Sequence, residues 1–223
     1  MAGLNQEQTE QIRLMSEWVR KKLAAEGTGH DWLHIERVQN ISLQIAKEEG
    51  ADLFVTEAST LLHDMIDVKL DDEHRVPLDE LKRRLSEDWK VDPGTIDGIL
   101  AIITRMSFRD REKYKDERLS KEGMAVQDAD RLDAIGAVGI ARALMYAGAK
   151  GHLLYGSANA PTAVGHFYEK LLLLKDLMNT KTGRMLAEKR HQLMLEFLGE
   201  LENECAFSRE SRLDRSGPGV MVE

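Results

Sequence analysis

Apolar residues recur along most of the chain at three- and four-residue intervals, the spacing that gathers them on one face of an α-helix. Residues 6–26 show the pattern first, and Gly27 follows as a stop signal. Asp31 is a suitable N-cap for a second helix, which Gly50 ends. The same periodicity predicts a third helix over residues 53–67.

The remaining apolar pattern predicts further helices, and β-branched runs typical of strands are nearly absent. Pro77 suits the first turn of one helix and Asp92 caps the next. The predicted helices cover residues 78–89, 93–106, 124–148, 167–178 and 182–204, with loops over 107–123 and 150–167. We therefore expect an all-α protein with a single domain over residues 1–207. The polar, glycine-containing tail, residues 208–223, is expected to be disordered.

Composition narrows the function classes. With 223 residues, 42% hydrophobic and 31% charged, the chain suits a globular domain rather than a disordered one. A net charge of −8 argues against general nucleic-acid binding. The lone Cys205 allows no internal disulfide. The first residues lack the apolar core of a secretory signal, and no stretch is apolar enough to span a membrane. We expect a cytoplasmic protein.

Ionisable residues inside apolar helix patterns are the main chemical signal. His63 and Asp64 follow the leucines of "TLLHDMID", where buried charge is costly unless it is paired or holds a metal. His34 and Asp130 lie in similar apolar surroundings. Two imidazoles and two carboxylates suit Mn²⁺, Fe²⁺, Co²⁺, Ni²⁺ or Zn²⁺ without choosing among them. The residue types alone fit a hydrogen-bonded core network equally well.

The segments around these residues carry a resemblance. "GHDWLHIERV", "LLHDMID", "MSF", "VQDADRLDAIGAVGIAR" and "HFYEKLLLLK" together resemble the HD-domain metal-dependent phosphohydrolases. They look most like a bacterial branch described as nucleoside triphosphate pyrophosphohydrolases, and the resemblance covers residues 5–205. It implies an all-α HD fold and one divalent cation, with Mn²⁺ preferred over Ni²⁺, Co²⁺, Fe²⁺, Zn²⁺ or Mg²⁺. The implied metal ligands are His34, His63, Asp64 and Asp130.

The same resemblance also has implications for how many metal ions the site holds and which residue serves as the catalytic base. Two-metal HD proteins use further histidines, and only His74 lies between Asp64 and Asp130, so a mononuclear site is favoured. On a helix that continues through Asp67, this residue shares a face with His63 and Asp64. Resemblance to related nucleotidases then assigns Asp67 as general base or water-orienting group. Its alternative role is to cap the helix or to pair with a nearby lysine.

Cations and polar groups for a polyphosphate substrate are also predicted. Lys69 lies close to Asp67, and Arg109 and Lys113 belong to a basic loop that closes on phosphates in this interpretation. The alternative interpretation is that this loop is an ordinary solvent-exposed surface segment of mixed charge. His30 is expected to order the entrance of the site or to contact substrate. Asp133, three residues after Asp130, is expected to support a metal ligand without coordinating the metal itself.

The preferred reaction is hydrolysis of a (d)NTP to a (d)NMP and pyrophosphate. A 5′-nucleotidase or nucleotide phosphodiesterase would use the same ligands. From another class, a non-catalytic nucleotide or metal sensor remains open, as does a purely structural helical protein. The expected partner is a small-molecule nucleotide, with neither nucleic acid nor membrane, and a homodimer is left open.

Overall fold

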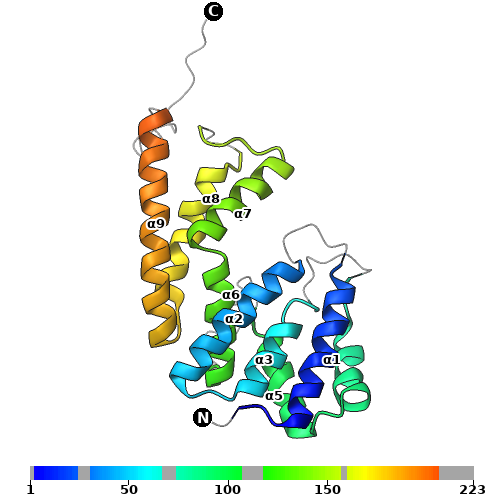
Figure 1. Cartoon of the computed structure of the whole chain (residues 1–223). Helices are drawn as coiled ribbons and strands as arrows, with labels where there is room; N and C mark the ends of the chain where they lie inside the picture. Colours follow the sequence, from blue (N-terminus) through cyan, green and yellow to red (C-terminus); the bar gives the residue numbers. More distant parts are fainter. Residues whose placement is uncertain (1–2, 25–30, 67–73, 107–117, 157–159, 206–223) are drawn as a thin grey trace, which may run out of the picture. The chain divides into compact units, whose positions relative to one another are not determined.

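The computed structural model describes residues 3–24, 31–66, 74–106, 118–156 and 160–205. Within these ranges the regular structure is helical, and β-pairing is limited to an isolated bridge between Leu153 and Thr162 (Figure 1). The predicted all-α class is confirmed. No single helix of the described segments combines the length and apolar composition needed to cross a membrane.

The contacts divide the chain into two compact units. The first comprises Met1–Asp133 and Met178–Leu186, and the second comprises Ala134–Leu177 and Ala187–Glu223. A single domain over 1–207 therefore stays a prediction, and the predicted tail, 208–223, lies outside the described residues.

The first unit contains most of the helices. They are α1 (Gln6–Lys22), α2 (Trp32–Glu49), α3 (Leu53–Leu62), α4 (Leu78–Arg83), the π-helical turn η1 (Arg84–Asp88), α5 (Pro93–Ile103) and α6 (Lys121–Asp133). Three cap predictions are confirmed. The Asp31 and Asp92 side chains accept backbone N–H groups in the first turns of α2 and α5, and Gly50 ends α2 with φ of 69°.

Helix α3 is the centre of the first unit, in contact with α1, α2, α5 and α6 (Figure 1). Leu61 and Leu62 at its end are fully buried, with Met15 of α1, Ile35 of α2 and Ile99 of α5 in the same core. Because the core encloses the end of α3, whatever follows Leu62 begins inside the protein.

A buried carboxylate ties α6 to the start of the last helix, α9 (Lys181–Cys205). Asp128 is 0% exposed. Its oxygens accept four hydrogen bonds, from the backbone and side-chain nitrogens of Asn179 at 2.8 and 2.9 Å and from the backbone N–H and hydroxyl of Thr180 at 2.8 and 2.7 Å. The donors fully satisfy this carboxylate, so its role is structural.

The second unit contains α7 (Gly136–Ala149), α8 (Ala163–Glu169), the 3₁₀ helix η2 (Leu171–Leu177) and most of α9. The predicted continuous helix 124–148 is wrong, because the chain breaks between α6 and α7. Gly136 has φ of 75°, and a Cβ there would lie 2.9 Å from Arg190 side-chain carbons. A Cβ on Gly139 would lie 2.3 Å from the Ala134 carbonyl oxygen. Both glycines therefore permit the close approach that makes the break.

Other predicted boundaries also differ. The first helix ends at Lys22 rather than residue 26, and the third ends at Leu62 rather than residue 67. The predicted helix 78–89 divides into α4 and η1, and most of 167–178 is 3₁₀-helical. The predicted loops end early, since α6 begins at Lys121 and α8 at Ala163. Periodicity detects the apolar face, but tertiary contacts select the helix type and its end.

Candidate metal centre

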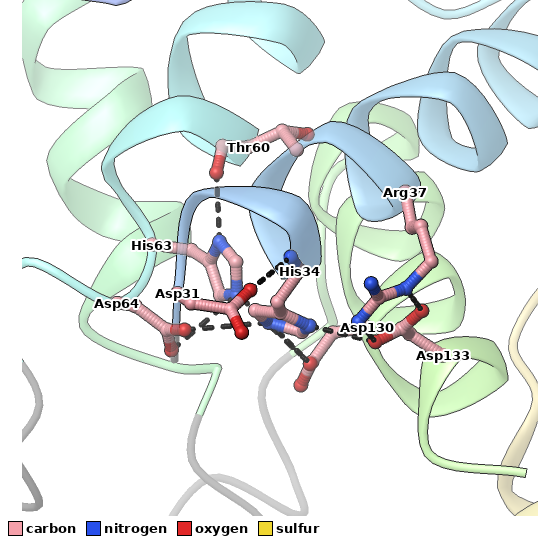
Figure 2. Close-up of polar contacts among 8 residues, drawn as sticks. All are labelled: Asp31, His34, Arg37, Thr60, His63, Asp64, Asp130 and Asp133. Carbon is pink, nitrogen blue, oxygen red and sulfur yellow. Dashed lines mark hydrogen bonds and ion pairs between the residues drawn. The ribbon is translucent and has the colours of Figure 1, made fainter. Parts of the chain in front are cut away.

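Three elements of the first unit bring the four predicted metal ligands together. His34 lies in the first turn of α2, where Asp31 Oδ1 accepts its backbone N–H at 2.8 Å. His63 is the C-cap of α3, Asp64 follows it in a turn, and Asp130 lies on α6. Figure 2 shows these side chains pointing toward one another.

The distances between their ligand atoms are short. His34 Nε2 lies 3.4 Å from His63 Nε2, 3.3 Å from Asp64 Oδ2 and 3.6 Å from Asp130 Oδ1. His63 Nε2 lies 3.4 Å from Asp64 Oδ1 and 3.9 Å from Asp130 Oδ1. Nitrogen and oxygen ligands bound about 2.1 Å from one ion lie roughly 3 to 3.4 Å apart in octahedral or tetrahedral geometry. These side chains are therefore spaced for a common cation after small adjustments.

The other ring nitrogen of each histidine is already engaged. His63 Nδ1 lies 2.7 Å from the Thr60 carbonyl oxygen, which can only accept, so Nδ1 carries the proton and donates it. His34 Nδ1 lies 2.8 Å from Asp133 Oδ2. With both Nδ1 atoms serving as donors, Nε2 is in each ring the nitrogen left to bind a cation, once any proton on it is displaced.

Electrostatics also favour a cation here. Burial of the His34 ring disfavours its charged form, but hydrogen bonds to Asp133 and Asp64 and the charges of Asp64 and Asp130 outweigh burial and raise its pKa to about 10. The side chains of His34 and Asp64 are only 2% and 8% exposed, so little solvent screens this pair, whereas Asp130 is 38% exposed. The carboxylates thus stabilise positive charge at the point where the Nε2 atoms meet.

The remaining predicted site residues cannot be placed. His30, Asp67, Lys69, Arg109 and Lys113 lie outside the described residues. The helical argument for Asp67 is wrong in one respect. α3 ends at Leu62 and residues 63–66 form turns, so the helix on which the argument depended does not extend to His63 and Asp64.

His74, the only histidine between Asp64 and Asp130, lies at a different place in the first unit. It lines a cavity of about 450 Å³ together with Trp18, Lys21, Lys22 and Arg84. None of the four predicted ligands lines that cavity. By contrast, ligand atoms of His34, His63 and Asp130 all lie within 4.8 Å of one another. Among the described residues, the cluster spaced to hold a metal ion thus excludes His74.

One residue close to the metal centre was not predicted from the sequence. Arg37, on α2, donates from Nε to Asp133 Oδ1 at 2.6 Å and from Nη2 to Oδ2 at 3.1 Å. Asp133 lies in hydrogen-bond contact with His34, one of the predicted ligands, as the sequence led us to expect. The available signal for Arg37 was its position one turn after His34, which places both side chains on one face of α2.

Comparison with known proteins points the same way as the geometry. A family profile described as HD domain matches residues 32–135. The chain is 54% identical over 197 residues to the YpgQ protein of Bacillus subtilis (strain 168), which covers 88% of this chain and 93% of YpgQ. The crystal structure of YpgQ in complex with ADP matches with a TM-score of 0.77 and 46% identity, covering 89% of this chain and 96% of that one. An HD-superfamily hydrolase from Bacillus thuringiensis matches with a TM-score of 0.74 and 37% identity, covering 90% and 100%.

Proposed function

Since the chain belongs to the HD-domain family, and is on that ground a metal-dependent phosphohydrolase, we propose that its substrate is a nucleoside triphosphate. The proposed reaction is (d)NTP plus water giving (d)NMP and pyrophosphate. The observation that carries the proposal is the convergence of His34, His63, Asp64 and Asp130 from α2, the end of α3 and α6.

The donor set fits a divalent transition ion, and HD domains bind divalent metals. We propose these four residues as its ligands and Mn²⁺ as the preferred ion. When bound, such an ion polarises a phosphoryl oxygen and lowers the pKa of water at the site. The protein's own contribution is orientation. Thr60 and Asp133 hold the two imidazoles so that both Nε2 atoms face the same point.

A nucleotide substrate is supported by the relative described above. The YpgQ crystal structure contains ADP, and 96% of that chain is covered by this one. ADP carries the adenosine and two phosphates of an adenine nucleoside triphosphate. We extend nucleotide binding to this chain because the match covers 89% of it and 96% of the YpgQ chain.

For site residues outside the described ranges, the proposed roles come from the sequence and its resemblance to the family. We propose Asp67 as the general base or water-orienting group and Lys69, Arg109, Lys113 and His30 as substrate contacts. Lysine and arginine donate charge-assisted hydrogen bonds to phosphate oxygens, which suits a polyphosphate substrate. A carboxylate near the metal accepts the proton of the attacking water.

A product assay tests the reaction. The purified protein, without a histidine tag, is incubated with each (d)NTP, (d)NDP and (d)NMP in Mn²⁺, Co²⁺, Ni²⁺, Zn²⁺, Fe²⁺ or Mg²⁺. Released phosphate is measured with and without added inorganic pyrophosphatase. We expect signal from triphosphates only when the pyrophosphatase is present. Direct phosphate release from monophosphates would instead identify a 5′-nucleotidase, and tight nucleotide binding without any turnover would identify a sensor.

A substitution tests the proposed base. Asp67→Asn should lower kcat by about 10²- to 10⁴-fold while the bound metal is retained. The matched control is Asp79→Asn, the same change at an exposed position in the first turn of α4, which should leave kcat unchanged. Full activity of Asp67→Asn with metal bound would refute the assignment.

A further inference from the structure

We infer that Asp133 and Arg37 form a positioning pair, which sets the tautomer and orientation of His34 and thereby the affinity of the centre for its cation. The inference rests on the proposed metal site and adds residues that coordinate nothing themselves. Of the two proposed histidine ligands, the inference assigns this adjustment of affinity to His34.

The pair occupies the next helical turn behind two of the proposed ligands. Arg37 lies three residues after His34 on α2, and Asp133 lies three residues after Asp130 on α6. The ion pair between them therefore joins the two helices directly behind the His34 ring. Figure 2 shows Asp133 between the His34 ring and the Arg37 guanidinium, on the side of the ring away from Asp64.

Asp133 is placed to act on His34 rather than on solvent. It is 1% exposed, and Oδ2 lies 2.8 Å from His34 Nδ1 and 3.1 Å from Arg37 Nη2. Oδ1 accepts from Arg37 Nε at 2.6 Å. A buried carboxylate is stable in its ionised form only when it is paired, and the forked contact with arginine supplies that pairing. The ionised carboxylate accepts the Nδ1 proton and leaves the Nε2 lone pair for the cation.

The second imidazole is held in another way. His63 Nδ1 donates to the Thr60 carbonyl, a backbone group of its own helix that no side-chain substitution removes. A neutral carbonyl also increases ring basicity less than a carboxylate does. The two proposed histidine ligands therefore differ: His63 is fixed by local backbone, whereas His34 depends on a partly buried ion pair contributed by two helices.

The test compares matched substitutions on α6. Asp133→Asn keeps the shape but loses the charge that orients His34, and it should weaken Mn²⁺ binding by about 10- to 100-fold. Asp128→Asn is the control, because Asp128 is equally buried on the same helix but bonds Asn179 and Thr180 instead of a ligand. It should lower the midpoint of urea unfolding while Mn²⁺ affinity stays within about twofold of the wild type.

Substitution of the arginine separates its two contributions. Arg37→Met removes both the positive charge and the parallel hydrogen bonds to Asp133, and it should weaken Mn²⁺ binding as Asp133→Asn does. Arg37→Lys restores the charge alone and should recover part of the affinity, because lysine cannot donate the parallel pair. Mn²⁺ affinity is measured by electron paramagnetic resonance of the free ion. The visible absorption of the Co²⁺-loaded protein reports ligand geometry and should change in Asp133→Asn but not in Asp128→Asn.

Two results would overturn the inference: wild-type Mn²⁺ affinity and Co²⁺ spectrum in Asp133→Asn, or an equal loss of affinity in Asp128→Asn. Circular dichroism of each metal-free variant verifies that it is folded. No substrate is present in these measurements, so a failure of nucleotide hydrolysis would refute the proposed reaction and leave this result standing. A wild-type protein that binds no Mn²⁺ would refute both.

Discussion

Asp128 and Asp130 lie two residues apart on α6 and belong to opposite kinds of polar cluster. Asp128 faces donors only: two groups of Asn179 and two of Thr180 surround its oxygens. Asp130 faces groups that coordinate metal ions: the Nε2 atoms of His34 and His63, with the Asp64 carboxylate beside them. Donors complete the first cluster, whereas a cation is needed to hold the second together. The facing groups, rather than burial alone, distinguish a structural carboxylate from a ligand.

Helix geometry explains how neighbours acquire such different surroundings. At about 100° per residue, positions two apart point in nearly opposite directions. One face of α6 packs on residues 179 and 180 before α9, and another packs on α2, which supplies His34.

The largest effect is expected for the cluster of His34, His63, Asp64 and Asp130. His63→Ala removes a proposed ligand, so stoichiometric Mn²⁺ should be lost and nucleotide hydrolysis should fall at least about 100-fold. Metal content is measured by inductively coupled plasma mass spectrometry, and hydrolysis by the product assay. If His63→Ala lost stability but kept its metal, the cluster would be a structural network instead.

Removal of Asp128 from its cluster with Asn179 and Thr180 should change the stability of the fold but not metal binding. Asp128→Ala leaves four donors without this acceptor, the two of Thr180 buried and the two of Asn179 part-buried, and should lower the unfolding free energy by about 3 kcal/mol. Urea denaturation measures the loss, and the folded variant should still bind one Mn²⁺. Asp97→Ala, at an exposed site on α5, is the control and should change stability by less than about 0.5 kcal/mol. Loss of metal from folded Asp128→Ala would mean that the two clusters are coupled.

Metal removal should produce an intermediate effect. At a free ion concentration of 100 times Kd, binding stabilises the folded state by about 2.7 kcal/mol. For a chain of this size, EDTA should therefore lower Tm by roughly 5 to 10 °C. Differential scanning calorimetry measures the shift, and His63→Ala should show none. An equal response of that variant to EDTA would place the stabilising ion elsewhere.

The smallest effect concerns pH in the metal-free protein. Because the folded-state pKa of His34 is raised from 6.5 to about 10, its protonation stabilises the fold fully below pH 6.5, and this contribution disappears as pH rises through 10. Between pH 7 and 8 the wild type in EDTA should lose about 1 kcal/mol more unfolding free energy than His34→Gln. Urea denaturation at the two pH values measures the difference. A wild type that instead gains stability relative to His34→Gln would have the opposite shift.

The pattern of the sequence was sufficient for the all-α class and for three of the helix caps. Asp31, Gly50 and Asp92 act locally, through the hydrogen bonds and backbone angles of a single helix end, so their roles can be read from neighbouring residues. The break after α6 was not predicted, because it depends on the fit of Gly136 against Arg190, more than fifty positions away. The end of α3 was also missed, since the apolar pattern continues beyond Leu62.

The sequence by itself determined the ligand types. His34, His63, Asp64 and Asp130 are ionisable residues in apolar helix patterns, and burial makes such groups costly without a partner. The tertiary structure decided what each one faces. Residues 34 and 133 are separated by 99 positions, and residues 37 and 133 by 96, so only the packing of α2 on α6 could pair them. Periodicity specifies which face of a helix is buried, but the partner of that face depends on the contacts of the whole fold.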